Sequence, residues 1–403
     1  MNVKIYPSRL SGELCAPPSK SFAHRELICA ALAEGESEVC GVSQSEDMLA
    51  TLDCLTALGA RCERRGDTVH IRGIEGKTPD GALLRCRESG STLRFLIPLS
   101  LTGGELRFEG APRLLERGIG LYEELLGKKG IEIKKDSGGI TLRGRLESGE
   151  YTLRGDVSSQ FVSGLLFALP RLSGDSVIRV LPPVESRAYI DVTLQVLAQF
   201  GIEICERAAN EFYVRGGQKY RAQRVFVEGD WSNAAALYAF NCVGGSVKVR
   251  SLREDSVQGD RVCLEYFKAL GSPGAVLDIS NCPDLGPVLF AAAAAIGKGA
   301  EFTGTRRLRI KESDRAAVMA QCLERFGIGC DVEDNSLTVL PGKLRAPSEP
   351  VSSHNDHRIV MALTLLMSVT GGEILSAQAV RKSYPDFFEQ LRAIGLEAEY
   401  EDR

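Results

Sequence analysis

Basic side chains occupy the start of a predicted helix in the stretch APPSKSFAHRELICAALAEG, residues 16–35. Lys20, His24 and Arg25 fall in its opening turns, directly after Pro17 and Pro18. A helix N-terminus carries unsatisfied N–H groups and roughly half a positive charge, so cations there are unfavourable unless an anion lies among them. This stretch therefore predicts an anion-binding site.

Polar and charged residues also mark the start of four other predicted helices. The motifs are ESGSTLR (88–94), with Gly90 and Arg94; DVSSQF (156–161), with Ser158, Ser159 and Gln160; RIKESDR (309–315), with Lys311, Glu312 and Arg315; and SSHNDHR (352–358), with Asn355, Asp356, His357 and Arg358. Ser, Asn and Asp are ordinary N-caps, so capping explains any one motif alone. Together the cations predict one site for a ligand with several negative charges, phosphate and carboxylate combined.

Three acids could carry protons at such a site. Glu312 adjoins Lys311, Asp284 precedes an alanine-rich run, and Asp47 lies in SEDMLATL. A carboxyl group among cations can stay ionised or take a proton as the chemistry requires, which makes Asp284 and Glu312 candidate acid–base residues. Asp47 is more simply a helix cap.

Two further cations, Arg117 in LLERGIG and Lys382 in RKSYPDFF, open other predicted helices. Either would be an ordinary surface charge by itself. They add to the predicted anion site only in combination with the motifs above.

The overall composition excludes some classes of partner. The 403 residues include 49 basic and 53 acidic ones, a net charge of −4, so no general basic field is available to hold nucleic acid. With 44% hydrophobic residues, a chain of this length can bury two ordinary cores. We therefore expect a two-domain protein whose anion site is local.

The twelve cysteines form no CxxC pair and fall mostly in apolar runs, as in a reduced cytoplasmic protein. His354 and His357 are closely spaced but have no further ligands nearby in the sequence, so we expect no zinc site. The N-terminal stretch MNVKIYPSRLSGEL has no apolar targeting core, and no apolar run is long enough for a bilayer. The expected location is the cytoplasm, without a membrane partner.

A repeat in the sequence predicts the helices and strands that position these residues. Six segments share an amphipathic run, a glycine and an alternating stretch, which predicts a helix with a glycine cap followed by a strand or hairpin. The marker glycines are Gly59, Gly130, Gly201, Gly271, Gly327 and Gly395, at intervals of 71, 71, 70, 56 and 68 residues.

Each repeat also contains a second, more apolar run. These runs are FAHRELICAALA, TLRFLIPLSL, SSQFVSGLLFALP, NAAALYAFNCV, PVLFAAAAAIG and RIVMALTLLMSV. They lack a broad polar face, so we expect them buried, with the amphipathic helices outside them. A unit of strand, buried helix, strand, outer helix and hairpin, used six times, predicts an α/β protein of two similar domains that meet near residues 220–230.

Nine motifs, in their order and spacing, resemble those of the 5-enolpyruvylshikimate-3-phosphate synthase family of enolpyruvyl transferases. They are PPSKSFAHR, ESGSTLR, DVSSQF, ESRAY, EGDWS, CPDLGP, RIKESDR, NDHR and KSYPDFF. The resemblance spans nearly the whole chain. SKS, SSQF, KESDR and NDHR are highly specific in combination, whereas ESGST or EGD alone is weak.

The resemblance implies a fold of two domains, each with three βαβαββ units arranged as an inside-out α/β barrel. It implies that the first strand joins the C-terminal domain, which gives residues 1–17 with 228–403 as one domain and 18–227 as the other. The active site is then expected in the cleft between them.

The resemblance also implies residue roles. Shikimate 3-phosphate would be bound by Lys20, Ser21, Arg25, Ser158, Ser159, Gln160, Ser186, Tyr189, Asp284 and Lys311. Phosphoenolpyruvate would be bound by Lys20, Gly90, Arg117, Gln160, Arg315, Arg358 and Lys382. The implied catalytic residues are Lys20, Asp284 and Glu312.

The implied reaction transfers the enolpyruvyl group of phosphoenolpyruvate to the 5-hydroxyl of shikimate 3-phosphate and releases phosphate. It belongs to the shikimate pathway of aromatic amino acid biosynthesis, needs no metal or organic cofactor, and is the family's target for glyphosate. Glu312 is expected to protonate the methylene carbon, while the hydroxyl and phosphate protons are left between Lys20 and Asp284. We expect a monomer.

Two positions depart from the family's pattern, because Glu88 and Arg307 replace asparagines found in other members. Neither change removes a cation or an acid of the implied site. One alternative function is UDP-N-acetylglucosamine enolpyruvyl transfer, but that family carries a cysteine in a loop where APRLLERGIG (111–120) has none. Another is a non-catalytic phosphometabolite-binding protein, which the presence of Lys20, Asp284 and Glu312 disfavours.

Overall fold

The computed structural model describes residues 1–74 and 79–401. The chain forms two compact units. The continuous unit is Pro18–Glu228, and the discontinuous unit combines Met1–Pro17 with Gly229–Arg403. We expected Glu228 in the discontinuous unit, but it belongs to the continuous one. Its carbonyl accepts the N–H of Ser19 at 2.7 Å, which ties it to the start of that unit.

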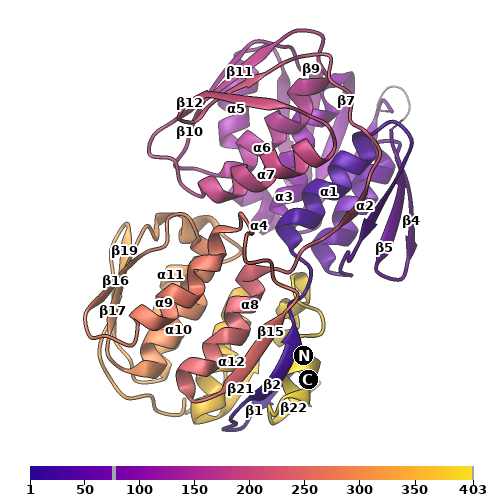
Figure 1. The fold of residues 1–403 in the computed structure, drawn as a ribbon. Coiled ribbons are helices and arrows are strands. Elements are labelled where there is room, and N and C mark those ends of the chain that lie inside the picture. Colours follow the sequence, from indigo (N-terminus) through magenta and orange to yellow (C-terminus); the bar gives the residue numbers. More distant parts are fainter. Residues whose placement is uncertain (75–78, 402–403) are drawn as a thin grey trace. The chain divides into compact units, whose positions relative to one another are not determined.

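The continuous unit contains three four-stranded sheets of identical layout (Figure 1). Their orders are β14-β3-β5-β4, β6-β7-β9-β8 and β10-β11-β13-β12. The first two strands of each order are parallel and the others pair in antiparallel fashion. The bounds are β3 Glu36–Cys40, β4 Arg61–Arg65, β5 Thr68–Arg72, β6 Ala82–Arg85, β7 Thr102–Glu109, β8 Glu132–Asp136, β9 Gly139–Arg145, β10 Glu150–Arg154, β11 Ser176–Leu181, β12 Ile204–Ala208, β13 Glu211–Val214 and β14 Arg224–Phe226.

Two kinds of helix accompany these sheets, as the apolar and amphipathic runs predict. The helices are α1 Lys20–Leu32, α2 Glu46–Ala57, α3 Gly90–Ser100, α4 Pro112–Arg117, α5 Gly120–Gly127, α6 Ser159–Ala168 and α7 Arg187–Gln199, with the 3-10 turn η1 Leu169–Arg171. The helices α1, α3 and α6 are buried along almost their whole length, and they form the core with the inner faces of the sheets. Parallel strands need such a crossover helix, which explains the alternation.

The discontinuous unit repeats this layout with two changes. Its sheets are β20-β21-β1-β22, β16-β17-β19-β18 and the two-stranded β15-β2. The bounds are β1 Asn2–Ile5, β2 Ser11–Cys15, β15 Ser246–Arg250, β16 Ala275–Asp278, β17 Ala300–Thr303, β18 Cys330–Val332, β19 Ser336–Val339, β20 Val351–Ser352, β21 Gly372–Leu375 and β22 Ala398–Glu401. The N-terminal strand β1 lies between β21 and β22 in one sheet, and no described hairpin extends the β15-β2 pair.

The missing hairpin explains the one short interval among the marker glycines. After Gly271 the chain enters β16 directly, which is already the first strand of the next sheet. The interval from Gly271 to Gly327 is therefore 56 residues instead of about 70.

The helices of this unit are again of two kinds, buried helices and more exposed ones. They are α8 Trp231–Tyr238, α9 Cys263–Ala269, α10 Gly286–Ile296, α11 Arg315–Arg325, α12 His357–Thr370 and α13 Phe387–Ala393, with the 3-10 turns η2 Ala239–Val243, η3 Gly259–Val262, η4 Pro283–Leu285, η5 Arg306–Ile310 and η6 Ala377–Lys382. The helices α8, α10 and α12 are the buried ones and contribute most of the core. Alanine predominates in α10, where small side chains let neighbouring helices approach closely.

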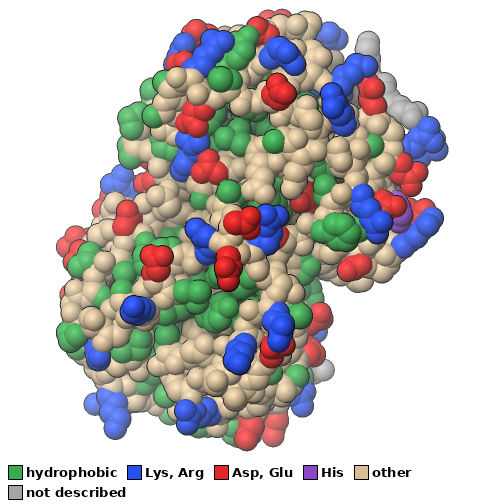
Figure 2. Space-filling model, in the orientation of Figure 1, with side chains coloured by type: hydrophobic (Ala, Val, Ile, Leu, Met, Phe, Trp, Pro, Cys, Tyr) green, Lys and Arg blue, Asp and Glu red, His purple; other side chains and the backbone are tan. Residues whose placement is uncertain are grey.

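The surface carries both signs of charge. On the face drawn in Figure 2, Lys and Arg side chains alternate with Asp and Glu. Of the helices that the structure describes, none combines the length and apolarity that a membrane crossing requires.

Candidate active site

A group of opposed charges surrounds Asp284 in the discontinuous unit. Lys311 Nζ and Arg315 Nη1 lie 3.0 and 2.9 Å from Asp284 Oδ1, and Arg358 Nη2 lies 3.9 Å from Oδ2. The turn η4 positions the carboxylate, while the ends of η5, α11 and α12 bring the three cations to it. The motifs CPDLGP, RIKESDR and NDHR thus meet at one place.

Arg315 is the centre of this group, and its side chain is 1% exposed. Besides Asp284, its guanidinium donates to Glu312 Oε2 at 2.7 Å and to Asp356 Oδ2 at 2.9 Å. Asp356 also accepts the hydroxyl of Ser313 at 3.0 Å and caps α12 through the N–H of Arg358 at 2.9 Å. One arginine therefore fixes three carboxylates relative to one another.

Burial and the neighbouring charges shift the pKa values of Asp284 and Lys311. Burial alone would raise the pKa of Asp284, but Lys311, Arg315 and Arg358 outweigh it and hold that pKa well below its ordinary value. Burial, opposed by Asp284, lowers the pKa of Lys311, and the nearby Arg315 and Arg307 add to the shift. Asp284 is thus held as a carboxylate beside an ammonium group that releases its proton more readily than a free lysine.

Arg358 also has neutral partners, and so does Lys382, the fourth predicted cation of this unit. Arg358 Nη1 donates to Asn233 Oδ1 at 3.1 Å and its Nη2 donates to the hydroxyl of Ser232. Lys382 Nζ donates to the carbonyl of Asn355 at 2.6 Å. Both residues therefore belong to the same corner of the unit, at the N-terminus of α12.

In the continuous unit, Lys20 forms an ion pair with Asp47, whose Oδ2 lies 2.9 Å from Lys20 Nζ. Lys20 opens α1 and Asp47 lies in the first turn of α2. The acid that the sequence suggested to be only a cap is the partner of the lysine. Its side chain does not cap α2, since Ser45 is the N-cap residue there.

Arg25 connects α1 to α7. Its Nη1 donates to the carbonyl of Ser21 at 2.7 Å and its Nη2 to the carbonyl of Tyr189 at 3.0 Å. Its Nε donates to Thr193 Oγ1 at 2.7 Å. Burial lowers the pKa of Arg25 to about 10, and it remains a cation at neutral pH. Ser21, Arg25 and Tyr189 are thus brought together as the sequence motifs imply.

A second cluster in this unit forms around Arg94, which the sequence motif contained but to which we assigned no role. Arg94 Nη1 donates to Gln160 Oε1 at 2.8 Å and its Nη2 to the carbonyl of Gly118 at 3.2 Å. A Cβ atom on Gly90 would lie 3.0 Å from Arg94 Nη1 and 3.3 Å from Arg117 Nη2. Two guanidinium groups therefore border the backbone of Gly90, at the N-terminus of α3.

Three predicted serines lie at helix starts of the same unit. Ser158 caps α6 by accepting the N–H of Gln160 at 3.3 Å, and Ser159 is the first residue of that helix. Ser186 precedes α7 with φ of 56°, a left-handed conformation that is uncommon for serine. Strain of this kind concentrates at functional sites.

The structure thus gathers the predicted residues into one group around Asp284 in the discontinuous unit and into several groups at helix starts in the continuous unit. Sequence reasoning missed the structural roles of Arg94, Asp47 and Asp356, although all three lay in motifs that it quoted. It also missed Ser232, the last residue of the motif EGDWS, and Asn233, the residue after it, which both accept hydrogen bonds from Arg358. The spacing of a motif does not show which distant charge it will meet.

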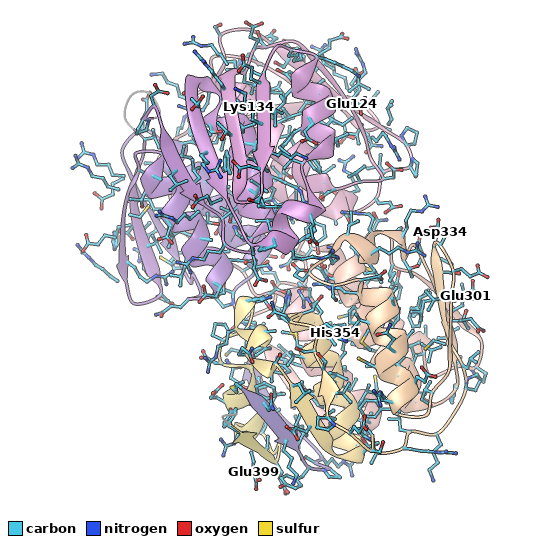
Figure 3. The ribbon with its side chains drawn as sticks, turned by 180° about the vertical axis from the view of Figure 1, so that it is seen from behind. Glu124, Lys134, Glu301, Asp334, His354 and Glu399 are labelled. Atoms are coloured by element: carbon cyan, nitrogen blue, oxygen red, sulfur yellow. The ribbon has the colours of Figure 1, made fainter. Side chains whose placement is uncertain are left out.

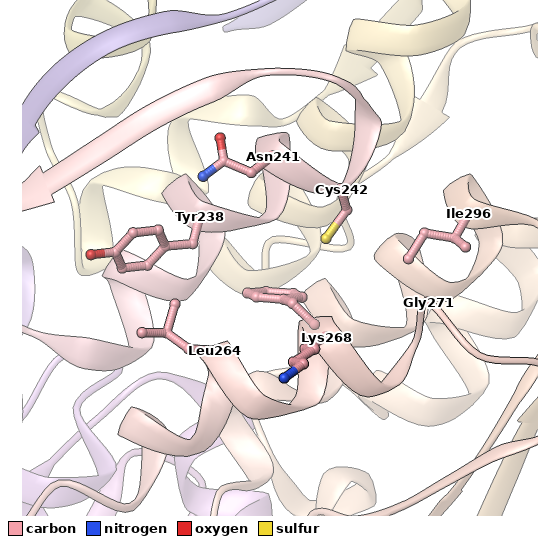
Figure 4. A pocket seen from close by; sticks show the side chains of 8 residues that line it. Tyr238, Asn241, Cys242, Leu264, Lys268, Gly271 and Ile296 are labelled. Carbon is pink, nitrogen blue, oxygen red and sulfur yellow. The ribbon is translucent and has the colours of Figure 1, made fainter.

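Two other features lie outside these clusters. An apolar pocket of about 410 Å³ in the discontinuous unit is lined chiefly by Tyr238, Cys242, Leu264, Phe267 and Ile296, and none of the predicted site residues lines it (Figure 4). Within the described residues, no group of three or more His, Cys, Asp and Glu could hold a metal ion. His354, labelled in Figure 3, is exposed, whereas His357 is buried.

Comparison with known proteins identifies the family. A family model described as EPSP synthase (3-phosphoshikimate 1-carboxyvinyltransferase) matches residues 5–273 and 266–391. A 3-phosphoshikimate 1-carboxyvinyltransferase of Clostridium kluyveri is 39% identical, over 98% of this chain and 97% of its own. One from Clostridioides difficile is 37% identical, with the same coverage.

A solved structure agrees with these sequence matches. The EPSP synthase of Acinetobacter baumannii superposes with a TM-score of 0.82 at 24% identity, and each chain is covered completely. This likeness confirms the expected α/β fold of two domains. The chain therefore belongs to the EPSP synthase (3-phosphoshikimate 1-carboxyvinyltransferase) family, the enolpyruvyl-transferring enzymes of the shikimate pathway.

Proposed function

We propose that this chain transfers the enolpyruvyl group of phosphoenolpyruvate to the 5-hydroxyl of shikimate 3-phosphate, and that the predicted residues of both units take part. The reaction follows from membership of the family, whereas its placement on these residues is our proposal. The observation that carries it is Asp284, a partly buried carboxylate kept ionised by three cations within 4 Å and joined through Arg315 to a second acid, Glu312.

Shikimate 3-phosphate would lie mainly on the continuous unit. Arg25 holds α1 and α7 together, and the hydroxyls and N–H groups at the starts of α1, α6 and α7 suit a phosphate. The residues assigned to this substrate are Lys20, Ser21, Arg25, Ser158, Ser159, Gln160, Ser186, Tyr189, Asp284 and Lys311. Asp284 and Lys311 would act at the 5-hydroxyl.

Phosphoenolpyruvate carries a phosphate and a carboxylate, and guanidinium groups bind both in bidentate fashion. Arg117 and Arg94 border the backbone of Gly90, and Arg358 and Arg315 flank Asp284. The residues assigned to this substrate are Lys20, Gly90, Arg117, Gln160, Arg315, Arg358 and Lys382, to which the geometry adds Arg94.

In the proposed chemistry, Glu312 first donates a proton and later removes one, and the proton of the 5-hydroxyl leaves with phosphate. Glu312, in its protonated form, gives a proton to the methylene carbon of phosphoenolpyruvate, and the 5-hydroxyl oxygen bonds to the adjacent carbon while its proton passes to the carboxylate of Asp284 or to Lys20 as the neutral amine. In the tetrahedral intermediate, the carbon–oxygen bond to phosphate then breaks, and phosphate leaves with the proton that came from the 5-hydroxyl. Glu312 removes a proton from the new methyl group, which restores the alkene.

Preorganised cations stabilise the charge that develops on the leaving phosphate. No step oxidises or reduces the substrates, so the proposal includes no redox cofactor. We further propose a cytoplasmic monomer. The twelve free cysteines support the location, because reducing compartments keep thiols unpaired.

The decisive experiment measures phosphate release from phosphoenolpyruvate with shikimate 3-phosphate as acceptor, and in parallel with UDP-N-acetylglucosamine. We expect release with shikimate 3-phosphate alone. A Glu312→Gln variant should lose this activity, while Glu349→Gln, which changes an exposed ion pair with Arg325, should keep it. Activity with UDP-N-acetylglucosamine instead, or binding without release in the unmodified protein, would refute the proposal.

A further inference from the structure

His24 is buried in the continuous unit and forms two hydrogen bonds that join three helices. Its Nδ1 lies 2.7 Å from Thr51 Oγ1 on α2, and its Nε2 lies 3.0 Å from Ser91 Oγ on α3. The ring itself belongs to α1, one turn after Lys20. A single side chain thus connects the start of α1 to the first turn of α3.

The two hydroxyls continue into a longer network. Thr51 Oγ1 lies 2.8 Å from Thr92 Oγ1, and Thr92 donates to Ser89 Oγ, the N-cap of α3, at 2.7 Å. Thr51 also donates to the carbonyl of Asp47 at 3.1 Å. Because Asp47 is the partner of Lys20, the network connects the lysine of α1 to the N-cap of α3.

The chemistry of the ring suits this position. Burial, with smaller contributions from Lys20 and Arg25, lowers the pKa of His24 well below its ordinary value, so the imidazole is neutral at physiological pH. A neutral imidazole offers one donor and one acceptor, and a hydroxyl can satisfy either. The ring is also held edge-on to Phe95, with centroids 6.3 Å apart and an interplanar angle of 84°.

The first turn of α3 has little room to move. A Cβ on Gly90 would lie 3.0 Å from Arg94 and 3.3 Å from Arg117, so a shift of a few tenths of an ångström changes the space between this backbone and the two guanidinium groups. Ser91, the residue that His24 holds, is the next residue of the same turn. The position of Ser91 therefore controls the shape of the pocket at Gly90.

We infer that His24 is a positioning residue, which sets the first turn of α3 and thereby the fit of the small phosphate- and carboxylate-bearing donor at Gly90, Arg94 and Arg117. The inference rests on the proposed function, because it takes this corner as the donor pocket. It assigns to His24 no contact with either substrate.

Three substitutions separate the shape of the ring from its hydrogen bonds. His24→Phe keeps a planar ring and removes both bonds, and we expect the KM for phosphoenolpyruvate to rise about tenfold, the size of one lost buried hydrogen bond. The KM for shikimate 3-phosphate and kcat should change less than about threefold. His24→Gln retains an amide that reaches one partner, and we expect it to recover at least half of the loss on a logarithmic scale.

Thr51→Val tests whether the effect runs through the network. It removes the hydroxyl at Nδ1 with little change of shape, in a residue that is completely buried behind the ring. We expect a threefold to tenfold rise in the KM for phosphoenolpyruvate, and no further rise when it is combined with His24→Phe. Such non-additivity is what residues acting in one network show.

Partial unfolding cannot imitate this result, because it lowers the active fraction and thus the apparent kcat, while the KM of the folded fraction stays the same. The matched control is His70→Gln on β5, whose ring faces Glu36 and Glu38 at the surface and which should leave all three constants unchanged. Gly90→Ala serves as the benchmark for the donor pocket.

The outcomes are distinguishable. If the unmodified protein fails to transfer the enolpyruvyl group, or if Gly90→Ala leaves the KM for phosphoenolpyruvate unchanged, the proposed function or its donor pocket is wrong. If both behave as proposed and His24→Phe changes that KM less than twofold, or changes both KM values equally, the role of His24 is refuted.

Discussion

Arg315 and Asp356 form an ion pair in which both side chains are almost completely buried, with 2.9 Å between Nε and Oδ2. Asp356 also caps α12, whereas Arg315 lies in the first turn of α11. The pair therefore fixes two helix starts relative to each other, and it holds the guanidinium between the two proposed proton carriers, Asp284 and Glu312.

The first prediction follows from this pair. Asp356→Asn keeps a good N-cap but removes the negative charge, so the protein should lose about 3 kcal/mol of unfolding free energy, as when a buried ion pair is broken. Because Arg315 positions both acids, kcat should also fall roughly 10- to 100-fold. Thermal unfolding and steady-state kinetics check the two effects.

The matched control is Asp314→Asn, since Asp314 caps α11 through the N–H of Ala317. It should keep both stability and kcat within the range of a surface substitution. Equal effects of the two substitutions would show that capping, and not the ion pair, is what matters at Asp356.

The second prediction concerns Lys20. Lys20→Met should reduce kcat/KM by about a thousandfold, because the cation is proposed to bind both substrates and to stabilise developing charge. Its ion pair with Asp47 is partly exposed and contributes at most about 1 kcal/mol, so the melting temperature should shift little. Lys128→Met, which breaks an exposed pair with Glu124 on α5, should leave activity intact. Near-normal turnover in folded Lys20→Met would contradict the assignment.

The third prediction concerns stability and pH. Burial, with a contribution from Glu228, raises the pKa of Glu26 to about 8 from an ordinary value of 4.5. Between these values the folded state keeps a proton that the unfolded state has lost. The contribution of Glu26 to stability is thus fully present below pH 4.5 and falls by about 1.4 kcal/mol per pH unit until the folded carboxyl also ionises.

Glu26→Gln removes this pH-dependent loss of stability, because an amide does not ionise. The difference in unfolding free energy between the variant and the parent protein, measured with denaturant, should therefore grow in favour of the variant from pH 5 to pH 8. Glu63→Gln is the control, because Arg65 lowers the pKa of that exposed carboxyl and its contribution is constant over this range. A pH-independent difference for Glu26→Gln would show that Glu26 does not hold its proton in the folded protein.

The fourth prediction concerns glyphosate, which in this family competes with phosphoenolpyruvate. The added methyl group of Gly90→Ala would press on the ends of Arg94 and Arg117, which are flexible enough to give way. The pocket should become shorter, and glyphosate, which is longer than phosphoenolpyruvate, should lose more affinity than the substrate does. The test is to measure the inhibition constant of glyphosate and the KM for phosphoenolpyruvate in the parent protein and in Gly90→Ala. Equal losses would leave Gly90 without a part in selectivity.

The sequence predicted the repeat and most of the polar helix starts because both are local patterns, but it was wrong at Arg117 and Lys382, which end α4 and η6 instead of opening a helix. A glycine at a helix end and an apolar run of helical length keep their meaning wherever the chain goes. The pairing of charges is different. Lys20 meets Asp47 across 27 positions and Arg315 meets Asp356 across 41, and nothing in either motif specifies its partner.

The same limit applies to His24, which lies in the motif PPSKSFAHR. Its spacing from Lys20 placed it on the α1 surface that carries the anion site, but its partners come from α2 and α3. The absent hairpin after Gly271 was, by contrast, visible as a short interval, although its cause required the strand pairing of β15 with β2.

The position of β1 has a consequence for how the protein is made. Ile5 pairs with Gly372 and with Ala398, so β1 finds its neighbours only after β21 and β22 have been synthesised. The continuous unit has all its described strands by Phe226 and can fold as a unit during that wait. Nascent chains interrupted after Glu228 would therefore carry the whole continuous unit, while β1 and β2 still lack their partners in the discontinuous unit.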